Sequence, residues 1–538
     1  MHHRRGTHRR NIAMTPTKFA ALALASVLAF GALPAAAQHQ HAPLPSLGDA
    51  GLMGSAEERR LGDEIARSVY RDPDWLDDAI LSEYVDGIWQ RLLAAARQRG
   101  ELNAEMAERY AWRVLIGRDN TINAFALPGG YFGLHTGLLG LVASRDELAS
   151  VLAHELTHVT QRHIARMIGQ EARQTPLMLA AMVLGALAAG SNAQAGAAIM
   201  AGGQAALIQQ QLNYSRAMES EADRIGWGVL TGAGYSPRGA AVMFERLQRA
   251  SGFNDNGEWP YLRSHPLTVQ RIGEAQQRQQ AVHAPALAPD VEALMMAARA
   301  RVLGKPGMDA LRTWAGAPQQ GGFDKLPAPE RVAALYAAAL AQRELRDVKG
   351  ALHTAERLTQ EAKGQGAAAA RQAALLHAEL LLADKQPTAA LRAIREMPAA
   401  PKGKESGLPQ AASQQGRAAL LLRAAARARL GDAKFNADSA AELRDWLALR
   451  PWDGGAWQAL ATADAAQGHT LQALRAEGEV FMARLDWEGA IDRFRAAQQR
   501  SRDAKDPAER IEASIIDTRL AAAREAQRRQ QEEGRKKN

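Results

Sequence analysis

Two histidines and a glutamate in this chain have the spacing of a metal site. His154 and His158 enclose Glu155 in an HExxH pattern. Residues four apart lie on one face of an α-helix, so both imidazoles can hold one metal ion. Glu155 directly follows the first histidine and can take a proton from a water at that ion. The pattern predicts hydrolysis of a peptide bond with one zinc ion per chain.

The residues around the pattern predict a helix that holds it. Ser144 and Glu147 form a capping box, and the helix is expected from about Asp146 to about Arg166. In one continuous helix, His163 is turned away from the ligand face and is interpreted as structural. The alternative is a solvated polar stripe on a core helix. Apolar residues recur at helical spacing at Leu148, Val151, Leu152, Leu156 and Val159.

A second segment, about sixty residues further on, offers the third ligand. Glu219 and Asp223 are four apart on a helical stretch that is expected to run to about Leu230. One carboxylate can bind the metal, and the other can accept the free N–H of a ligand histidine. Spacing alone does not decide between these roles, and Glu221 remains a third candidate. The alternative is an ordinary charged helix surface.

Three motifs together resemble the gluzincin metallopeptidases, the family that includes HtpX and the CAAX prenyl proteases. They are HExxH, the SRxxExxAD run from Ser215 to Asp223, and the triplet from Ser264 to Pro266. The resemblance covers about residues 54 to 280 and, more loosely, the rest.

The resemblance implies a role for each matching residue. His154, His158 and Glu219 become zinc ligands, and Glu155 becomes the general base. Asp223 supports the site. Arg216 falls near the reacting carbonyl and would stabilise its developing negative charge. His265 would take the fourth zinc position and hold the enzyme latent.

The predicted fold is mainly α: a zincin-type metallopeptidase domain with a small β-sheet over residues 54–284, followed by an α-solenoid of tetratricopeptide-like repeats over 285–520. Strands are expected at 112–116, 122–127 and 131–136, with a turn at 128–130. Peptidases often bind substrate as an added strand on a sheet edge. The alternative is a small sheet without a substrate role.

The C-terminal half has a loose period near 34 residues. Trp457, Leu460 and Ala473 fall at tetratricopeptide positions, and helix pairs are expected at 331–360, 367–397 and 420–449, with an interrupting loop at 398–416. Such units stack into a solenoid with a concave binding face. The alternative is a helical bundle without repeats. The charged tail, 521–538, is interpreted as a frayed helix or a disordered segment.

Residues 1–37 have the features of a secretory signal peptide. Five basic residues precede an apolar run over residues 19–33. Small residues then lead to a cleavage site near Ala37. We expect export to a bacterial periplasm, with residues 38–53 as a linker; the alternative is an uncleaved anchor. Removal of five cations lowers the formal charge from +8 to about +3, which argues against nucleic-acid binding. The chain has no cysteine and therefore no disulfide.

Residues 174–215 carry no charge. This stretch is interpreted as a helical lid beside the zinc or a hairpin with peripheral membrane contact; the alternatives are a buried helix pair and a membrane span.

With the leader and repeats, the resemblance implies a zinc endopeptidase of outer-membrane protein assembly and quality control. It would degrade misassembled barrel proteins and dock on them and on their assembly machinery. The alternatives are a chaperone or scaffold that acts through its repeats, and a membrane-anchored protease like HtpX.

Overall fold

A computed structural model gives the fold of most of the chain. It describes residues 53–170, 216–252, 259–282, 286–399, 416–502 and 506–537. The predicted signal peptide, the uncharged stretch, and nearly all of the linker and of the interrupting loop lie outside the described residues. Residues 48–538 form one compact unit.

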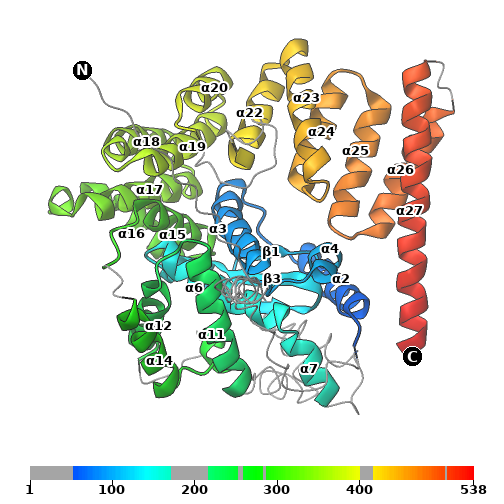
Figure 1. Ribbon diagram of the computed structural model, residues 1–538. Helices are drawn as coiled ribbons and strands as arrows, with labels where there is room; N and C mark the ends of the chain where they lie inside the picture. The colour runs from blue at the N-terminus through cyan, green and yellow to red at the C-terminus, as the bar shows by residue number, and fades with distance from the viewer. Residues whose placement is uncertain are drawn as a thin grey trace, which may run out of the picture. The chain divides into compact units, whose positions relative to one another are not determined.

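The described part is mainly helical with one small sheet, as predicted (Figure 1). The elements before residue 285 are α2 (Ser55–Arg71), α3 (Ala79–Gln98), α4 (Ala104–Arg109), β1 (Arg113–Gly117), β2 (Ala124–Leu127), η2 (Pro128–Gly130), β3 (Tyr131–His135), α5 (Thr136–Leu141), α6 (Arg145–Thr160), α7 (His163–Gln170), α11 (Arg216–Gly232), α12 (Arg238–Ser251), α13 (Pro260–Ser264) and α14 (Val269–Ala281).

The sheet has three strands in the order β1-β3-β2. β1 runs parallel to β3, and β2 runs antiparallel to it across the short turn η2. All three strands lie within two residues of their predicted bounds at each end. β2 is an edge strand and packs against α6. The HExxH helix therefore lies beside a sheet edge.

Packing on several sides fixes the position of α6. Ser144 caps its first turn by accepting a hydrogen bond from the backbone N–H of Glu147 at 3.2 Å. Helices α3, α11 and α12 pack against α6. Helix α11 approaches α6 closely at Gly226, where a Cβ would stand 3.0 Å from the backbone oxygen of Ala153. A larger residue at 226 would push α11, with Glu219 and Asp223, away from the histidines.

The predicted helix from Asp146 to Arg166 is wrong in one respect, because the chain breaks between α6 and α7. Gln161 ends α6, and Arg162 has a φ of +53°, in the left-handed region that interrupts a right-handed helix. Tertiary contacts hold this turn. The Arg162 guanidinium donates to Glu58 at 2.7 Å and to the backbone oxygen of Met53. His163 therefore begins a new helix with a new direction.

The C-terminal half is a series of helices in which successive members pack on one another (Figure 1). Gly478 and Phe494 show how close they come: a Cβ at Gly478 would meet the Phe494 ring at 2.4 Å. This region is helical, as predicted. Its elements are α15 (Val291–Leu303), α16 (Met308–Gly316), η3 (Ala317–Gln319), η4 (Phe323–Lys325), α17 (Ala328–Glu344), α18 (Val348–Lys363), α19 (Ala367–Ala383), α20 (Pro387–Glu396), α22 (Gly416–Leu430), α23 (Ala433–Leu449), α24 (Gly454–Ala466), α25 (Thr470–Ala483), α26 (Trp487–Ser501) and α27 (Pro507–Lys537).

Helix α3 joins the two halves. It contacts α6 and α11 on the peptidase side and α15 and α22 on the repeat side. Three arginines from the repeat side donate to carboxylates in or next to the start of α3. The pairs are Arg299–Asp78 at 2.5 Å, Arg371–Glu83 at 2.6 Å and Arg417–Asp77 at 2.9 Å. Contacts thus cross the predicted boundary at residue 284.

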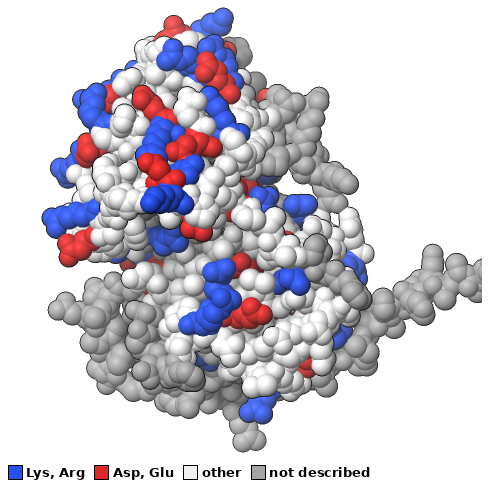
Figure 2. Space-filling view, turned by 90° about the vertical axis from the view of Figure 1, so that its left-hand side faces the viewer, with Lys and Arg blue, Asp and Glu red and all other residues white. Residues whose placement is uncertain are grey.

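The apolarity of the helices and the surface charge concern binding to membranes and to nucleic acid. Within the described ranges, no helix combines the length and apolarity needed to cross a bilayer. Basic and acidic side chains are intermixed on the face drawn in Figure 2, and neither sign forms a continuous patch there. Nucleic-acid binding proteins concentrate basic charge on one face.

Candidate metal centre

Four buried side chains converge on one point. His154 and His158 come from α6, Glu219 from the first turn of α11, and His265 from the residue that follows α13. Each offers one ligand atom, and these atoms all lie within 4.8 Å of one another. The structure thus brings together the four residues that the sequence analysis assigned to the metal.

The spacing of these atoms suits a zinc ion. His154 Nε2 lies 3.0 Å from His158 Nε2, 3.4 Å from Glu219 Oε2 and 3.3 Å from His265 Nδ1. In a tetrahedral site with bonds of about 2.0–2.1 Å, ligand atoms stand about 3.3–3.4 Å apart. Imidazole nitrogens with one carboxylate are the donors that zinc takes, whereas calcium and magnesium prefer oxygen alone. The residues therefore fit zinc.

Asp223 supports His154 from behind. Its Oδ1 lies 3.0 Å from His154 Nδ1, on the ring edge opposite the nitrogen that faces the cluster. A proton on Nδ1 leaves a lone pair on Nε2 for the metal. Of the two carboxylates that spacing left undecided, Glu219 faces the histidine nitrogens and Asp223 holds a ring in place.

Sequence reasoning missed Arg271 of α14. Its guanidinium donates to both oxygens of Asp223 at 2.7 and 2.9 Å, and Nη1 lies 2.8 Å from Glu219 Oε2. Burial would raise the pKa of Asp223, but Arg271 and His154 outweigh it and lower that pKa to about 2. Asp223 is therefore an acceptor at any ordinary pH. Arg271 follows His265 by six residues, but no spacing rule marks it beforehand.

The local charges also keep Glu219 ionised. Burial would raise the pKa of Glu219, but His265 and His154 lower it well below its usual value. Burial would lower the pKa of His154, but Glu219 and Asp223 raise it to about 10 without a metal. This concentration of negative charge favours a cation at the cluster.

His163 and Glu221 lie on the far side of His158. His163 Nδ1 lies 2.8 Å from His158 Nδ1, and His163 Nε2 lies 3.1 Å from Glu221 Oε2. Arg166 donates to the same Glu221 oxygen at 2.9 Å. Glu221, the third candidate carboxylate, therefore faces His163 and not the cluster. His163 is in contact with a ligand because the helix breaks just before it.

Glu155 lies beside the cluster and is buried. It is 1% exposed, and neither carboxylate oxygen forms a hydrogen bond within the described part of the chain. Burial raises the pKa of Glu155, although His265 and His154 act in the opposite direction. Its Oε1 lies 3.5 Å from His265 Nε2. A buried carboxylate without hydrogen-bond partners is costly and is a mark of a functional site.

The segment that carries His265 is anchored to the sheet edge. Tyr261 of α13 donates its backbone N–H to the oxygen of Ile122 at 3.1 Å, just before β2. The Tyr261 and His265 rings lie 4.8 Å apart, and both side chains are buried. His265 is thus held firmly between Glu155 and Glu219.

Arg216 is not brought to the cluster. It is the first residue of α11, and its side chain is exposed. Among the described residues, no hydrogen bond or ion pair links it to the four ligand candidates.

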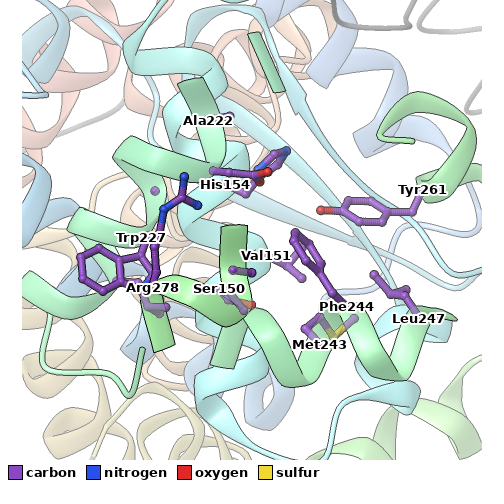
Figure 3. A pocket seen from close by; sticks show the side chains of 15 residues that line it. Ser150, Val151, His154, Ala222, Trp227, Met243, Phe244, Leu247, Tyr261 and Arg278 are labelled. Carbon is purple, nitrogen blue, oxygen red and sulfur yellow. The ribbon is translucent and has the colours of Figure 1, made fainter. Parts of the chain in front are cut away.

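A small apolar cavity of about 30 Å³ adjoins His154 and Asp223 (Figure 3). Trp227 of α11 and Met243 and Phe244 of α12 are among the residues that line it. Apolar surroundings strengthen a hydrogen bond. The cavity walls therefore reinforce the contact between Asp223 and His154.

Comparison with known families defines the class of the protein. Residues 88–279 match Peptidase family M48. This segment contains the HExxH pattern of α6, Glu219 and Asp223 of α11, Arg271 and His265. This part of the chain is therefore similar to the peptidases of that family.

The similar proteins point to one group within this class. A putative beta-barrel assembly-enhancing protease of Vibrio cholerae is 36% identical over 283 residues, which are 52% of this chain and 56% of that protein. The beta-barrel assembly-enhancing protease of Escherichia coli is 30% identical over 237 residues, 44% of this chain and 47% of the relative. A mitochondrial metalloendopeptidase of Arabidopsis thaliana is 33% identical over 166 residues, 30% of this chain and 31% of the relative. The chain spans about half the length of the two bacterial relatives.

Proposed function

We propose that this chain is a zinc-dependent endopeptidase of the bacterial periplasm that acts on outer-membrane barrel proteins during their assembly. The observation that carries the proposal is the buried set of His154, His158, Glu219 and His265 beside Glu155. Metal-assisted hydrolysis would use His154, His158 and Glu219 as ligands and Glu155 as the base.

The residues of the chain have distinct parts in the proposed reaction. When bound, zinc would polarise the scissile carbonyl and make a water more acidic. Glu155 takes a proton from the attacking water and passes it to the leaving amine. Its enclosure suits this part, because burial brings the pKa of a carboxyl group closer to neutrality. We assign no part to Arg216.

The substrate is proposed to bind as an extra strand along β2. This strand is at an edge of the sheet and packs against the HExxH helix. Pairing through backbone hydrogen bonds tolerates many sequences, and it suits unfolded segments of barrel proteins, which are rich in β-strand sequence.

His265 is proposed to hold the site latent. Its Nδ1 lies 2.9 Å from Glu219 Oε1 and 3.3 Å from His154 Nε2, so it stands where a fourth ligand would. A fourth protein ligand leaves no position for water, and catalytic zinc sites keep one open. Activation then requires that the segment around α13 move away from Ile122.

The location and client remain proposals from the signal-peptide features of residues 1–37 and from the names of the bacterial relatives. The helices after residue 285 are proposed to be tetratricopeptide-like repeats that bind barrel proteins or their assembly machinery.

One experiment tests the proposal directly. The mature chain is incubated with an unfolded outer-membrane barrel protein, with zinc present or removed by a chelator and then restored. Cleavage that needs zinc and spares a folded soluble protein supports the proposal. A purified chain that contains no zinc, or cleavage that is insensitive to the chelator, contradicts it.

A further inference from the structure

His158 has a partner that the peptidase reaction does not require. A series of contacts runs from the buried His158 and His163 to the partly exposed Glu221, where Arg166 joins it. His163 is 0% exposed and begins α7, directly after the left-handed residue Arg162. The turn at Arg162 brings His163 back toward a residue five positions earlier, which a straight helix would not do.

The ionised carboxylate of Glu221 determines which ring nitrogens of His163 and His158 carry a proton. An ionised carboxylate accepts hydrogen bonds and donates none. Glu221 accepts a hydrogen bond from Arg166. Because an ionised carboxylate has no proton to donate, the contact between Glu221 and His163 requires a proton on His163 Nε2. With its one proton on Nε2, neutral His163 accepts at Nδ1. His158 Nδ1 must then carry a proton and donate it across the 2.8 Å contact.

This order of protons determines what His158 offers to the cluster. A neutral imidazole protonated at Nδ1 has its lone pair on Nε2. His158 Nε2 is the atom that faces His154 Nε2 at 3.0 Å and Glu219 Oε1 at 3.4 Å. The opposite tautomer would present a hydrogen atom to the metal.

We infer that His163 is a positioning residue, which together with Glu221 holds His158 in the one tautomer that can bind zinc. His163 accepts the Nδ1 proton of His158, just as Asp223 accepts the Nδ1 proton of His154. The inference rests on the proposed zinc function, because it concerns zinc affinity.

The test compares His163→Leu with His163→Asn. Both variants lose the contact with Glu221, but only asparagine keeps an acceptor near the position of Nδ1. His135→Leu is the matched control, because His135 is also buried in this domain and contacts Thr121 at 2.9 Å instead of the cluster. Zinc affinity of the full mature chain is measured by competition with a chromophoric chelator. The unfolding temperature of the metal-free protein is recorded beside it.

We expect His163→Leu to weaken zinc binding by about 10–100-fold, the range seen when a partner of a ligand is removed. His163→Asn should stay within a few-fold of the wild type, and His135→Leu should bind zinc like the wild type. Equal losses in the leucine and asparagine variants of His163, or affinity within twofold in the leucine variant, would overturn the inference. Failure of the wild type to bind zinc would instead refute the proposed function.

A measurement on the unaltered protein covers the case in which the variants do not fold. In zinc-loaded protein with ¹⁵N-labelled histidine, one-bond and two-bond couplings report which ring nitrogen carries the proton. We expect His163 to be protonated at Nε2 only and His158 at Nδ1 only. A proton on Nδ1 of His163 contradicts the inference.

Discussion

Arg271 and Asp223 form a bidentate ion pair, in which Nε and Nη2 of the arginine donate to the two carboxylate oxygens at 2.7 and 2.9 Å. Through Asp223 the pair sets the orientation of His154, and through Nη1 it reaches Glu219. One arginine from α14 therefore contacts both Glu219 and Asp223 of α11.

Replacement of Arg271 by methionine is expected to weaken zinc binding by about tenfold or more, because both carboxylates lose the charge that orients them. Chelator competition measures the effect. Arg249→Met is the control, since Arg249 of α12 pairs with Glu245 at an exposed site, where an ion pair contributes little. Similar affinities in the two variants would argue against this role for Arg271.

Replacement of Glu155 by glutamine should separate binding from catalysis. Glutamine keeps the shape but cannot take a proton, so we expect full zinc content and a loss of cleavage of about 10²–10⁴-fold. Metal analysis and cleavage of an unfolded barrel protein are measured on one preparation. The variant degrading its client at the wild-type rate would rule out Glu155 as the base.

Replacement of His265 by alanine should increase activity, because it opens the fourth position of the cluster. The other three ligands should still hold zinc, whereas Glu219→Ala should lose it. Both variants are compared with the wild type for zinc content and cleavage rate. If His265→Ala loses zinc as readily as Glu219→Ala does, His265 is a structural ligand and not a latch.

The scaffold alternative makes a different prediction in cells. If the helices after residue 285 act without proteolysis, a Glu155→Gln chain should rescue a deletion strain under outer-membrane stress as well as the wild type. If cleavage is needed, the rescue should fail at equal protein levels. Growth on a detergent or antibiotic that the outer membrane normally excludes provides the readout.

Asp453 gives a pH-dependent prediction for the repeat region. It caps α24 and accepts hydrogen bonds from Arg417 at 2.8 Å and from Trp446 Nε1 at 2.9 Å. Burial would raise the pKa of Asp453, but Arg417 outweighs it, and the pKa is lowered from 3.8. Because the folded pKa is lowered, the stabilisation is complete above the unfolded value and is lost as pH falls through the folded value.

Asp453→Asn should therefore lower the unfolding temperature at pH 7, and the difference from the wild type should shrink at pH 3. Thermal melts at the two pH values check this. Asp309→Asn is the control, because Asp309 pairs with Arg312 at an exposed site. A difference that stays constant between pH 7 and pH 3 would contradict the assignment.

The sequence predicts those parts of the site that depend on local spacing. His154 and His158 share a face of α6 because the helix is regular between them, and Ser144 begins that helix as a capping residue does. β-Branched and aromatic residues place the three strands well. Regular elements are predictable because their periodicity is set by neighbours in the chain.

The parts that depend on distant contacts could not be predicted. The break at Arg162 is held by Glu58 and Met53, about a hundred residues earlier, so nothing near Arg162 announces it. The interpretation of His163 as structural assumed a continuous helix and therefore missed its contact with His158. Arg271 and the choice between Glu219, Glu221 and Asp223 likewise needed the tertiary arrangement of α11 and α14.

The three arginines that meet the start of α3 limit how this protein can be dissected. A fragment that ends at residue 284 would keep the three carboxylates, Asp77, Asp78 and Glu83, but lose their partners, Arg299, Arg371 and Arg417. It would also expose the face of α3 that packs against α15 and α22, and α3 itself packs against the HExxH helix α6. An inactive fragment of this kind would report damaged packing, not a need for client docking. What the helices after residue 285 recognise is better tested by substitutions on their outer surface, which leave the contacts of α3 intact.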